Sequence, residues 1–449
     1  MTKSSAWVAA AAATACVLGF MSAPAAHAEP EAYNNWYPTE YDLQASDGPA
    51  WRVTMDASGK GVVFSGSDYR DYNAATDTWG PWKRLHTDPE RLTAKGNARG
   101  DVCSAWSADF GAAIACRTAG STNFVKTNLT ASRNATVEEL AVSSDGRRAL
   151  VIWRDTSNNR SRENATVYTL ATQQASTTQL QGIPGGTPLR YYPVSARIGR
   201  SNGFALAYVT GEEGTRGSAT YYRTFRPSQG WSPQRALRLG TPAQAVVLSD
   251  FTSDGRRTYA AVTPDIPQNA NDYPAEWWIT ELNTDGTFSS PEVVNTTLDW
   301  PVIGSSSTSV HIAGRNPATR DLVIAGSGDF IDAPIAINNI PSPRIGAGEG
   351  SVTDVAIVGQ RFASGSDGFA VVVQYSGVLN PGGDDDESED RLYTLVGEDV
   401  GGLSTLRRLG NKAGYEGMVP HLAGYGQYAL TAYSWGLQIY AGARGPLPS

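Results

Sequence analysis

A short phrase that occurs twice limits what this chain can fold into. Residues 143–153 read SSDGRRALVIW, and residues 252–262 read TSDGRRTYAAV. In each copy a polar turn containing Asp-Gly leads into a run of apolar residues without polar alternation. A strand of this kind is buried on both faces, so we expect its sheet to be sandwiched between two others.

Units of the same kind recur along the whole chain. In the first copy, Asp145 and Gly146 predict a two-residue hairpin turn, because Asp-Gly favours positive φ angles. The long-period pattern of amphipathic helices is hard to find after residue 30, and short runs rich in Val, Ile, Tyr, Trp and Thr alternate with polar turns. The chain is therefore predicted to be nearly all β. Related units lie at residues 59–66, 201–209, 319–326, 366–375 and 426–435.

Self-similarity at a spacing of roughly 40–65 residues is typical of a β-propeller, whose blades cannot bury their faces alone. Successive repeats begin near residues 51, 102, 138, 194, 246, 309, 353 and 419. They predict a single propeller of eight four-stranded blades, or of seven if the short unit at 103–116 belongs to its neighbour. We expect the ring to close by pairing an early segment, WYPTEYDLQA, with the C-terminal strands. The alternative is a chain of two β-sandwich domains.

The first 28 residues have the pattern of a secretory signal peptide. Lys3 precedes an apolar, alanine-rich run from residue 6 to residue 21, and the small-residue site Ala26-His27-Ala28 follows. No later segment is apolar over the length that a membrane helix needs. We therefore expect a secreted, extracellular protein in which residues 29–449 form one propeller domain.

Cysteine content and charge narrow the function classes. Beyond the leader only Cys103 and Cys116 remain, and an even pair in an exported protein predicts a disulfide. The residues between them are typical of two short strands around Asp109-Phe110-Gly111; two unrelated buried thiols are the alternative. The formal charge of −8 argues against nucleic acid or an anionic membrane as a partner.

Motifs that resemble catalytic sites lack the required context. Gly199-Arg200-Ser201-Asn202-Gly203 matches the G-x-S-x-G pattern of serine hydrolases, but a strand-like segment follows where a helix is needed. The glycine-rich stretch at 346–350 also precedes a strand-like segment and is interpreted as a loop.

Metal and cofactor sites are not predicted. His86, His311 and His421 belong to different repeats and are interpreted as packed or surface residues. An acidic run at 384–390 lacks the alternate spacing of a calcium loop. We interpret it as a solvated loop between two strands of one blade, with calcium or a basic partner as the alternatives.

Carboxylate pairs for glycoside hydrolysis cannot be recognised from sequence, because the reaction depends on their separation in space. The repeats lack the spacing and the tryptophan of sialidase boxes, which disfavours a sialidase. Other propeller hydrolases and lyases stay open, with Asp71, Asp272 and Glu276 as weak candidates.

The twelve tryptophans and twenty tyrosines suggest carbohydrate binding instead. Sugars stack their C–H faces on aromatic rings while polar side chains bind their hydroxyls. Because one of the adjacent Trp277 and Trp278 must face a neighbouring blade, at least half of these rings are expected in the core. The candidate ligand-binding residues are Tyr69, Asp71, Trp79, Trp82, Asp272, Tyr273, Trp277 and Trp435.

The alanine-rich leader, the chain length, the predicted disulfide and repeats such as SDGRRALVIW together resemble the secreted β-propeller lectins of actinobacteria, and most closely the lectin subunits of umbrella toxin particles. The resemblance covers the whole chain through its architecture, and no individual binding residue carries over. It implies recognition of a glycan on a bacterial surface and docking onto a protein adaptor in a secreted particle. The acidic residues Asp384, Asp385, Asp386 and Glu387 are then the predicted partner-binding segment. A secreted hydrolase or lyase, or a scaffold without a sugar site, are the alternatives.

Overall fold

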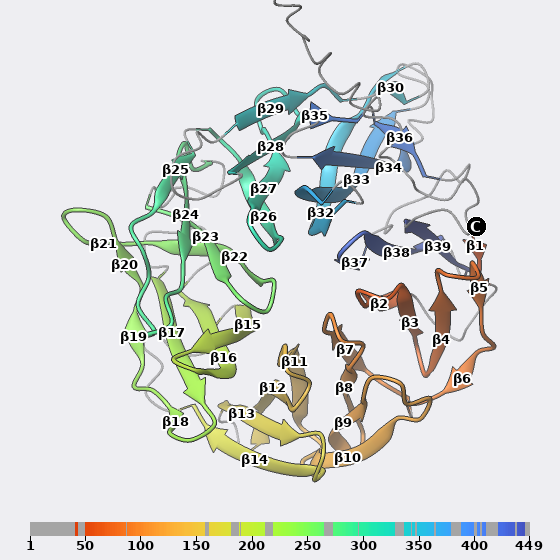
Figure 1. The fold of residues 1–449 in the computed structure, drawn as a ribbon, viewed down its shortest axis with the longest axis vertical. Coiled ribbons are helices and arrows are strands. Elements are labelled where there is room, and N and C mark those ends of the chain that lie inside the picture. The colour runs from red at the N-terminus through yellow and green to blue at the C-terminus, as the bar shows by residue number, and fades with distance from the viewer. Residues whose placement is uncertain are drawn as a thin grey trace, which may run out of the picture.

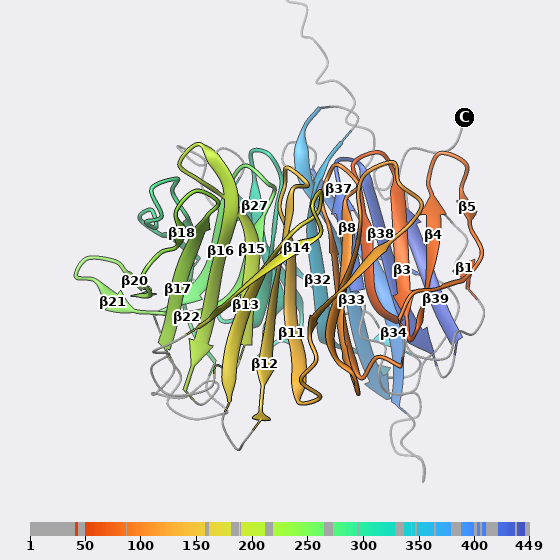
Figure 2. The same ribbon diagram turned by 90° about the horizontal axis from the view of Figure 1, so that it is seen from below.

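The computed structural model is a ring of eight β-sheet blades around a central axis (Figure 1). Seen from the side, the strands of each blade run through the thickness of the disc (Figure 2). The described part of the chain contains no α-helix, and hence none able to cross a membrane. The structure describes residues 41–444 except 44–49, 87, 158–160, 181–187, 189, 212–218, 265–272, 295, 328–335, 343, 346–347, 363–364, 379–387, 399–401, 405, 410–420 and 436–437.

Each blade is an antiparallel sheet whose first strand lies nearest the axis, except that the last blade borrows its outermost strand from the N-terminal segment. Blades 1 and 2 contain β2 (Ala50–Met55), β3 (Lys60–Ser65), β4 (Asp68–Asn73), β5 (Thr78–Trp79) and β6 (Lys83–Arg84), then β7 (Arg91–Gly96), β8 (Val102–Ala108), β9 (Gly111–Arg117) and β10 (Val125–Thr130). Blades 3 and 4 contain β11 (Ala135–Val142), β12 (Arg148–Asp155), β13 (Arg162–Thr169) and β14 (Gln174–Gln179), then β15 (Arg190–Ile198), β16 (Ser201–Thr210), β17 (Ala219–Arg226), β18 (Gly230–Trp231) and β19 (Arg235–Ala236).

The second half of the ring follows the same plan. Blades 5 and 6 contain β22 (Val247–Ser253), β23 (Thr258–Thr263), β24 (Trp277–Glu281) and β25 (Glu292–Val294), then β26 (Asp299–Ser305), β27 (Val310–Arg315), β28 (Leu322–Ser327) and β29 (Ala336–Ile340). Blades 7 and 8 contain β32 (Ser351–Arg361), β33 (Asp367–Val378), β34 (Ser388–Glu398), β35 (Gly402–Leu403) and β36 (Arg407–Arg408), then β37 (His421–Tyr425), β38 (Tyr428–Trp435), β39 (Gln438–Arg444) and β1 (Tyr41–Asp42). Two small hairpins, β20 (Arg238–Leu239) with β21 (Gln244–Ala245) and β30 (Arg344–Ile345) with β31 (Gly348–Glu349), lie outside the blades.

This arrangement confirms the predicted all-β propeller and shows that it has eight blades, not seven. The unit at 103–116 is the middle hairpin of its own blade, β8 and β9, so it does not belong to a neighbour. Two predicted starts, 102 and 309, fall close to the second strand of their blades. The reason is compositional: the innermost strands there, RLTAKG and DWPVIGS, are less apolar than the strands that follow them.

The ring closes as predicted, by joining the two ends of the chain. β1 pairs with β39, with Tyr41 opposite Ala441 and Asp42 opposite Tyr440. Leu43 then buries its side chain in the core between blades 8 and 1, where it is 1% exposed. The N-terminal segment therefore contributes both backbone hydrogen bonds and apolar burial to the last blade.

The interior consists of eight hydrophobic clusters, and each cluster is shared by two neighbouring blades. The repeated phrase shows how a single strand supplies two of them. In β12, Val151 and Trp153 face blade 2, whereas Leu150 and Ile152 face blade 4. The unbroken apolar run is thus explained by burial against a neighbour on each side, which excludes separate sandwiches.

The two copies of the phrase also place their turns close together. The predicted two-residue turn is wrong: five residues, 143–147, connect β11 to β12, and the Ser143 N–H donates to the Arg148 carbonyl. Only Gly146 of the Asp-Gly pair has a positive φ, +68°. A Cβ added to Gly255 in the second copy would lie 2.8 Å from the Cβ of Ser144 in the first, so the turns of blades 3 and 5 approach each other near the axis.

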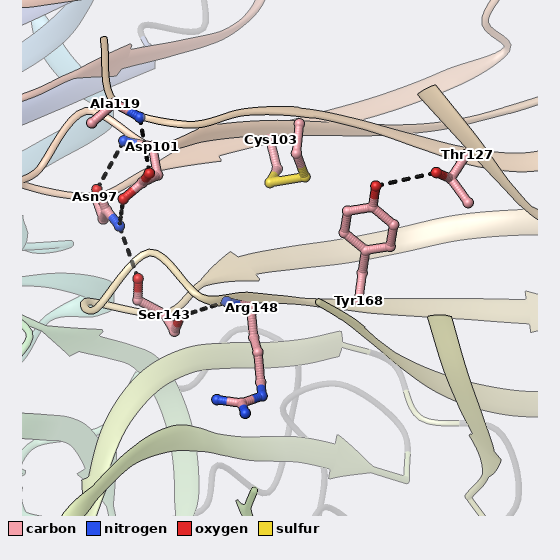
Figure 3. The surroundings of a disulfide bond; sticks show 9 residues. Asn97, Asp101, Cys103, Ala119, Thr127, Ser143, Arg148 and Tyr168 are labelled. Atoms are coloured by element: carbon pink, nitrogen blue, oxygen red, sulfur yellow. Dashed lines mark hydrogen bonds between the residues drawn. A yellow bond between two sulfur atoms is a disulfide. The ribbon is translucent and has the colours of Figure 1, made fainter. Parts of the chain in front are cut away.

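A buried polar network joins the turn of blade 3 to blade 2 (Figure 3). The Asn97 side-chain amide donates to the Asp101 carboxylate at 2.9 Å and to the Ser143 carbonyl at 2.8 Å. The second oxygen of Asp101 accepts from the Ala119 N–H at 2.9 Å. A Cβ on Gly146 would lie 1.9 Å from the Asp101 carboxylate, so only glycine fits against this network.

The predicted disulfide is confirmed, and it joins Cys103 to Cys116 across the hairpin of β8 and β9. The two cysteines are directly opposite each other in the register, and both are buried against blade 3. Figure 3 shows the bridge between the Asn97–Asp101 network and a second contact, 3.1 Å long, that joins the hydroxyls of Thr127 and Tyr168 across blades 2 and 3.

Candidate functional site

Four of the predicted ligand residues lie together in blade 1, where two of them help to close the ring. The Arg70 guanidinium lies 5.9 Å from the ring centroids of both Trp79 and Trp82. Arg70 and the Trp82 indole N–H each donate to the Leu43 carbonyl at 2.9 Å. These two tryptophan rings are therefore engaged in holding the N-terminal segment against the last blade.

Tyr69 and Asp71 are engaged in a neighbouring cluster. The Asp71 carboxylate accepts from Lys83 at 3.1 Å and from Arg117 of blade 2 at 2.6 Å. The Tyr69 ring is 5% exposed and packs edge-on against Phe124 at 4.9 Å. Asp71 is thus the centre of an ion-pair network between blades 1 and 2, and the Tyr69 ring offers no open face.

The remaining predicted ligand residues do not form one site. Trp277 is fully buried between blades 5 and 6, so its ring is part of the core and we remove it from the candidate site. Tyr273 is 38% exposed just before β24. Trp435 lies at the end of β38 in blade 8, and Asp272 lies outside the described residues.

The weak catalytic candidates are likewise not brought together. Asp71 belongs to blade 1, whereas Glu276 precedes β24 in blade 5 and accepts a hydrogen bond from the Trp278 indole. Three blades separate them, so they cannot act as a carboxylate pair. Gly199 and Arg200 form the tight turn between β15 and β16, as expected for a motif that is not a nucleophile elbow.

The three histidines lie in different parts of the ring. His86 is 1% exposed, contacts the Ser104 hydroxyl at 2.8 Å, and has its pKa lowered to about 3 by burial. His311 packs its ring 4.5 Å from that of Phe369. In the described part of the chain no cluster of His, Cys, Asp and Glu side chains could hold a metal ion. The acidic residues Asp384–Glu387 lie outside the described residues.

The axis of the propeller contains a cavity of about 280 Å³ that the innermost strands of all eight blades line. Figure 1 looks down this axis, with β2, β7, β11, β15, β22, β26, β32 and β37 around the centre. Within the described ranges, the charged residues that line the cavity are Lys95 of blade 2 and Asp250 of blade 5. We call this space the axial cavity.

Glycines let the innermost strands approach one another around the axial cavity. A Cβ on Gly359 of β32 would lie 2.0 Å from the Ser305 carbonyl oxygen of β26, and one on Gly304 would lie 3.1 Å from the Val358 carbonyl carbon. Backbone cannot yield as a flexible side chain can, so a methyl group at Gly359 would push two blades apart.

A second cavity, of about 320 Å³, lies between blades 4 and 5. It is bounded by β17, β18 and the start of β19 on one side and by the turn at Asp285 and Gly286 on the other. The Tyr222 hydroxyl donates to the Gly286 carbonyl at 3.2 Å and fixes the two walls relative to each other. We call this space the blade 4–5 pocket.

The blade 4–5 pocket combines an aromatic ring with charged groups. Trp231 is half-buried, and its ring packs 5.4 Å from that of Phe225. Arg226 donates to the Gln229 side chain at 3.3 Å and to the Asp285 carbonyl at 3.4 Å. The exposed Arg235 guanidinium also lines the pocket and forms no hydrogen bond or ion pair with any other described residue.

Asp285 supplies the acceptor of the blade 4–5 pocket. Two hydrogen bonds from Thr287, one from its hydroxyl at 2.6 Å and one from its N–H at 2.8 Å, lower the pKa of the Asp285 carboxyl. Both bonds reach the same oxygen, Oδ1. Asp285 is therefore a carboxylate at neutral pH, with Oδ2 available to accept from a ligand.

Sequence reasoning did not identify this pocket. The segment GWSPQRAL at 230–237 carries Trp231 and Arg235 and is similar in sequence to TWGPWKRL at 78–85. Both segments form outer strands of their blades, and each outer strand splits around a proline, Pro233 or Pro81. The two segments differ in what lies against their rings: Arg70 of the same blade contacts Trp79 and Trp82, whereas Trp231 borders the blade 4–5 pocket.

Comparison with known proteins identifies the fold and nothing finer. No protein-family model and no curated protein matches the sequence. Among solved structures, the WD40 domain of SCAP from fission yeast is similar over 92% of this chain and 98% of its own, with 8% identity and a TM-score of 0.54. The Dos1 propeller covers 91% of this chain and 94% of its own at 10% identity, and the polysaccharide lyase Uly1 covers 78% and 90% at 9%, with TM-scores of 0.49 and 0.43. The chain is an eight-bladed β-propeller.

Proposed function

We propose that this protein is a secreted, lectin-like propeller that binds a glycan of a bacterial surface in the blade 4–5 pocket without cleaving it. Within this proposal it is the target-recognition subunit of an extracellular antibacterial toxin complex. The observation that carries the binding function is the combination of Trp231, two arginines and Asp285 around one cavity.

The chemistry of the blade 4–5 pocket suits a sugar ring. The flat indole of Trp231 matches the C–H face of a pyranose, and such contacts bury apolar area at low entropic cost. Arg226 and Arg235 donate hydrogen bonds, while Asp285 accepts them. A small number of convergent polar groups around an aromatic surface is typical of specific ligand pockets.

The same geometry disfavours hydrolysis at this place. A glycosidase needs a carboxylic acid that is protonated at working pH and a second carboxylate at a fixed separation. The Thr287 hydrogen bonds hold the pKa of Asp285 below its usual value, which is the opposite of what a general acid requires. Among the residues that the structure describes, Asp285 is also the one carboxylate side chain that lines the pocket.

Secretion is supported by two independent features. The N-terminal 28 residues have the composition of a signal peptide. The Cys103–Cys116 disulfide fits an oxidising compartment. The toxin complex and its adaptor are proposed from the resemblance to umbrella toxin lectins. A pull-down from the culture fluid of the producing organism tests this part of the proposal. Co-purification of an adaptor supports the complex, and recovery of the protein alone contradicts it.

The binding function is tested on a glycan array, followed by titration of the strongest ligand. The Trp231→Ala variant should lose about 10–100-fold in affinity, as expected when a central aromatic contact is removed. The matched control is Tyr273→Ala, which removes an exposed aromatic residue of blade 5 outside the pocket and should leave affinity unchanged.

The outcomes separate the proposal from its alternatives. Equal affinity in the Trp231→Ala variant and the wild type, with a loss in Tyr273→Ala, would move the site to the loop before β24. Release of reducing ends from the bound glycan would make the protein a hydrolase. The absence of any ligand on the array would favour a scaffold without a sugar site.

A further inference from the structure

The axial cavity contains a cation that the fold does not use. Lys95 lies near the end of β7, in blade 2, and its side chain is exposed to the cavity. Its ammonium group forms no hydrogen bond and no ion pair with any residue that the structure describes. Lys83, by contrast, belongs to a structural network, because its ammonium group pairs with the Asp71 carboxylate at 3.1 Å.

The other charged lining residue is Asp250, whose pKa the Lys95 charge lowers, but the two side chains form no ion pair. Asp250 lies at a bulge in β22, and its two carboxylate oxygens accept from the Phe251 N–H at 2.8 Å and the Ile303 N–H at 2.9 Å. The bond from Ile303 joins blade 5 to blade 6. Burial raises the pKa of Asp250, while the two hydrogen bonds and the charge of Lys95 act in the opposite direction.

The charge of Lys95 also affects the pKa of a neighbouring histidine, His421. His421 begins β37 in blade 8, and its pKa is lowered to about 3, first by burial and then by the charges of Arg52 and Lys95. Both charges act on the same region of the axis, and Glu139 of β11 partly offsets that of Arg52. An incoming anion would meet these charges in a partly enclosed space, where electrostatic attraction is stronger than in bulk water.

Hydrogen-bond donors surround the same space. Thr54 of β2 and Ser305 of β26 both line the axial cavity, and their buried hydroxyls have no hydrogen-bond partner among the described residues. A buried hydroxyl without a partner is unfavourable, so such groups call for a water or a ligand. The innermost strands also turn their unpaired backbone edge toward the axis.

We propose that the axial cavity is a second ligand site, which binds the oxyanion of a small molecule through an ion pair with the Lys95 ammonium. The ligand class is a small organic acid or a sulfate or phosphate ester. This site is separate from the blade 4–5 pocket and does not depend on what that pocket binds.

The proposal is tested by calorimetric titration of the full-length mature protein with acetate, inorganic sulfate and inorganic phosphate, and with galacturonate against galactose. The wild type should bind at least one anion and should not bind galactose at this site. Lys95→Met keeps the length of the side chain without its charge and should weaken binding by at least about tenfold, the effect of losing one charge-assisted hydrogen bond. The ratio of affinities among the three inorganic or acetate probes distinguishes a carboxylate from a sulfate or phosphate ligand.

Three variants keep the result interpretable. Lys126→Met changes an exposed lysine on the outer strand of the same blade and should bind as the wild type does. Lys95→Arg should retain binding, which separates loss of charge from loss of folding. Trp231→Ala should bind the anion normally and so keeps this test independent of the lectin proposal. No anion binding to the wild type at about 10 mM, or binding that Lys95→Met leaves unchanged, would overturn the proposal.

Discussion

Replacing Gly146 with alanine tests how the repeated phrase is built into the ring. Gly146 has φ +68°, and an added Cβ would lie 1.9 Å from the Asp101 carboxylate. Gly199 provides a matched control, because its φ is +65° and an added Cβ would meet no atom within 4 Å. The two substitutions therefore share the backbone strain and differ in the displaced carboxylate.

The expected magnitudes follow from these distances. Alanine in the left-handed region costs about 1–2 kcal/mol, which is the full effect expected for Gly199→Ala. Gly146→Ala additionally forces Asp101 away from Asn97 and the Ala119 N–H, and disrupting hydrogen bonds to a buried carboxylate adds about 2–3 kcal/mol. Gly255→Ala should lie between the two, because its Cβ would meet only the Ser144 side chain at 2.8 Å.

The assay is urea unfolding followed by tryptophan fluorescence, with the free energy of unfolding compared at equal m-values. A double-mutant cycle isolates the contribution of the carboxylate. In an Asp101→Ala background, Gly146→Ala should lower the free energy of unfolding only by the backbone strain, so the two substitutions should couple by about 2 kcal/mol. If Gly146→Ala were no more destabilising than Gly199→Ala, or if the cycle showed no coupling, the structural reasoning would be refuted.

Three further predictions concern ring closure, the disulfide and acid stability. Leu43→Ala should lower the free energy of unfolding by about 2–5 kcal/mol, since Leu43 fills the core between the last and first blades; a thermal midpoint equal to that of the wild type would mean that the N-terminal segment does not close the ring. Replacing both Cys103 and Cys116 with alanine should cost about 2–3 kcal/mol in urea unfolding, because the loop that they close spans 13 residues, and a change near zero would contradict this. Burial holds the pKa of His86 at about 3 in the folded state, so the unfolded chain binds more protons between pH 3 and 6.5. The free energy of unfolding should therefore fall on acidification through this range, by up to about 1.4 kcal/mol per pH unit. A His86→Gln variant should show a shallower pH dependence, and an unchanged slope would argue against a neutral buried histidine.

The architecture was predictable because burial leaves a clear pattern in the sequence. Runs such as 149–153 are apolar at every position, which only a sheet packed on both faces explains, and their recurrence implies a ring. The disulfide followed from the spacing of two cysteines across a predicted hairpin. Blade starts failed where the innermost strand is polar, as in RLTAKG, because this strand faces the axis and needs less apolar surface.

The candidate site was much harder to predict, because aromatic residues have the same signature in cores and in pockets. Trp82 follows Pro81, and Trp231 lies two residues before Pro233, both in the outer part of a blade. The Trp82 indole nevertheless donates to the Leu43 carbonyl, whereas Trp231 borders the blade 4–5 pocket. The difference depends on residues far apart in the chain: Asp285 of blade 5 faces Arg226 of blade 4 only after the ring forms. Lys95 likewise has no sequence signal, since its place in the axial cavity depends on the eight strands that surround that cavity.

The most direct test of the lectin function is a crystal structure of the protein grown with the strongest ligand from the glycan array. The proposal predicts an intact glycan whose pyranose ring lies on the Trp231 indole, with hydroxyls bound by Asp285 and Arg235. A glycan bound elsewhere on the ring, or one found cleaved at a glycosidic bond, would contradict it.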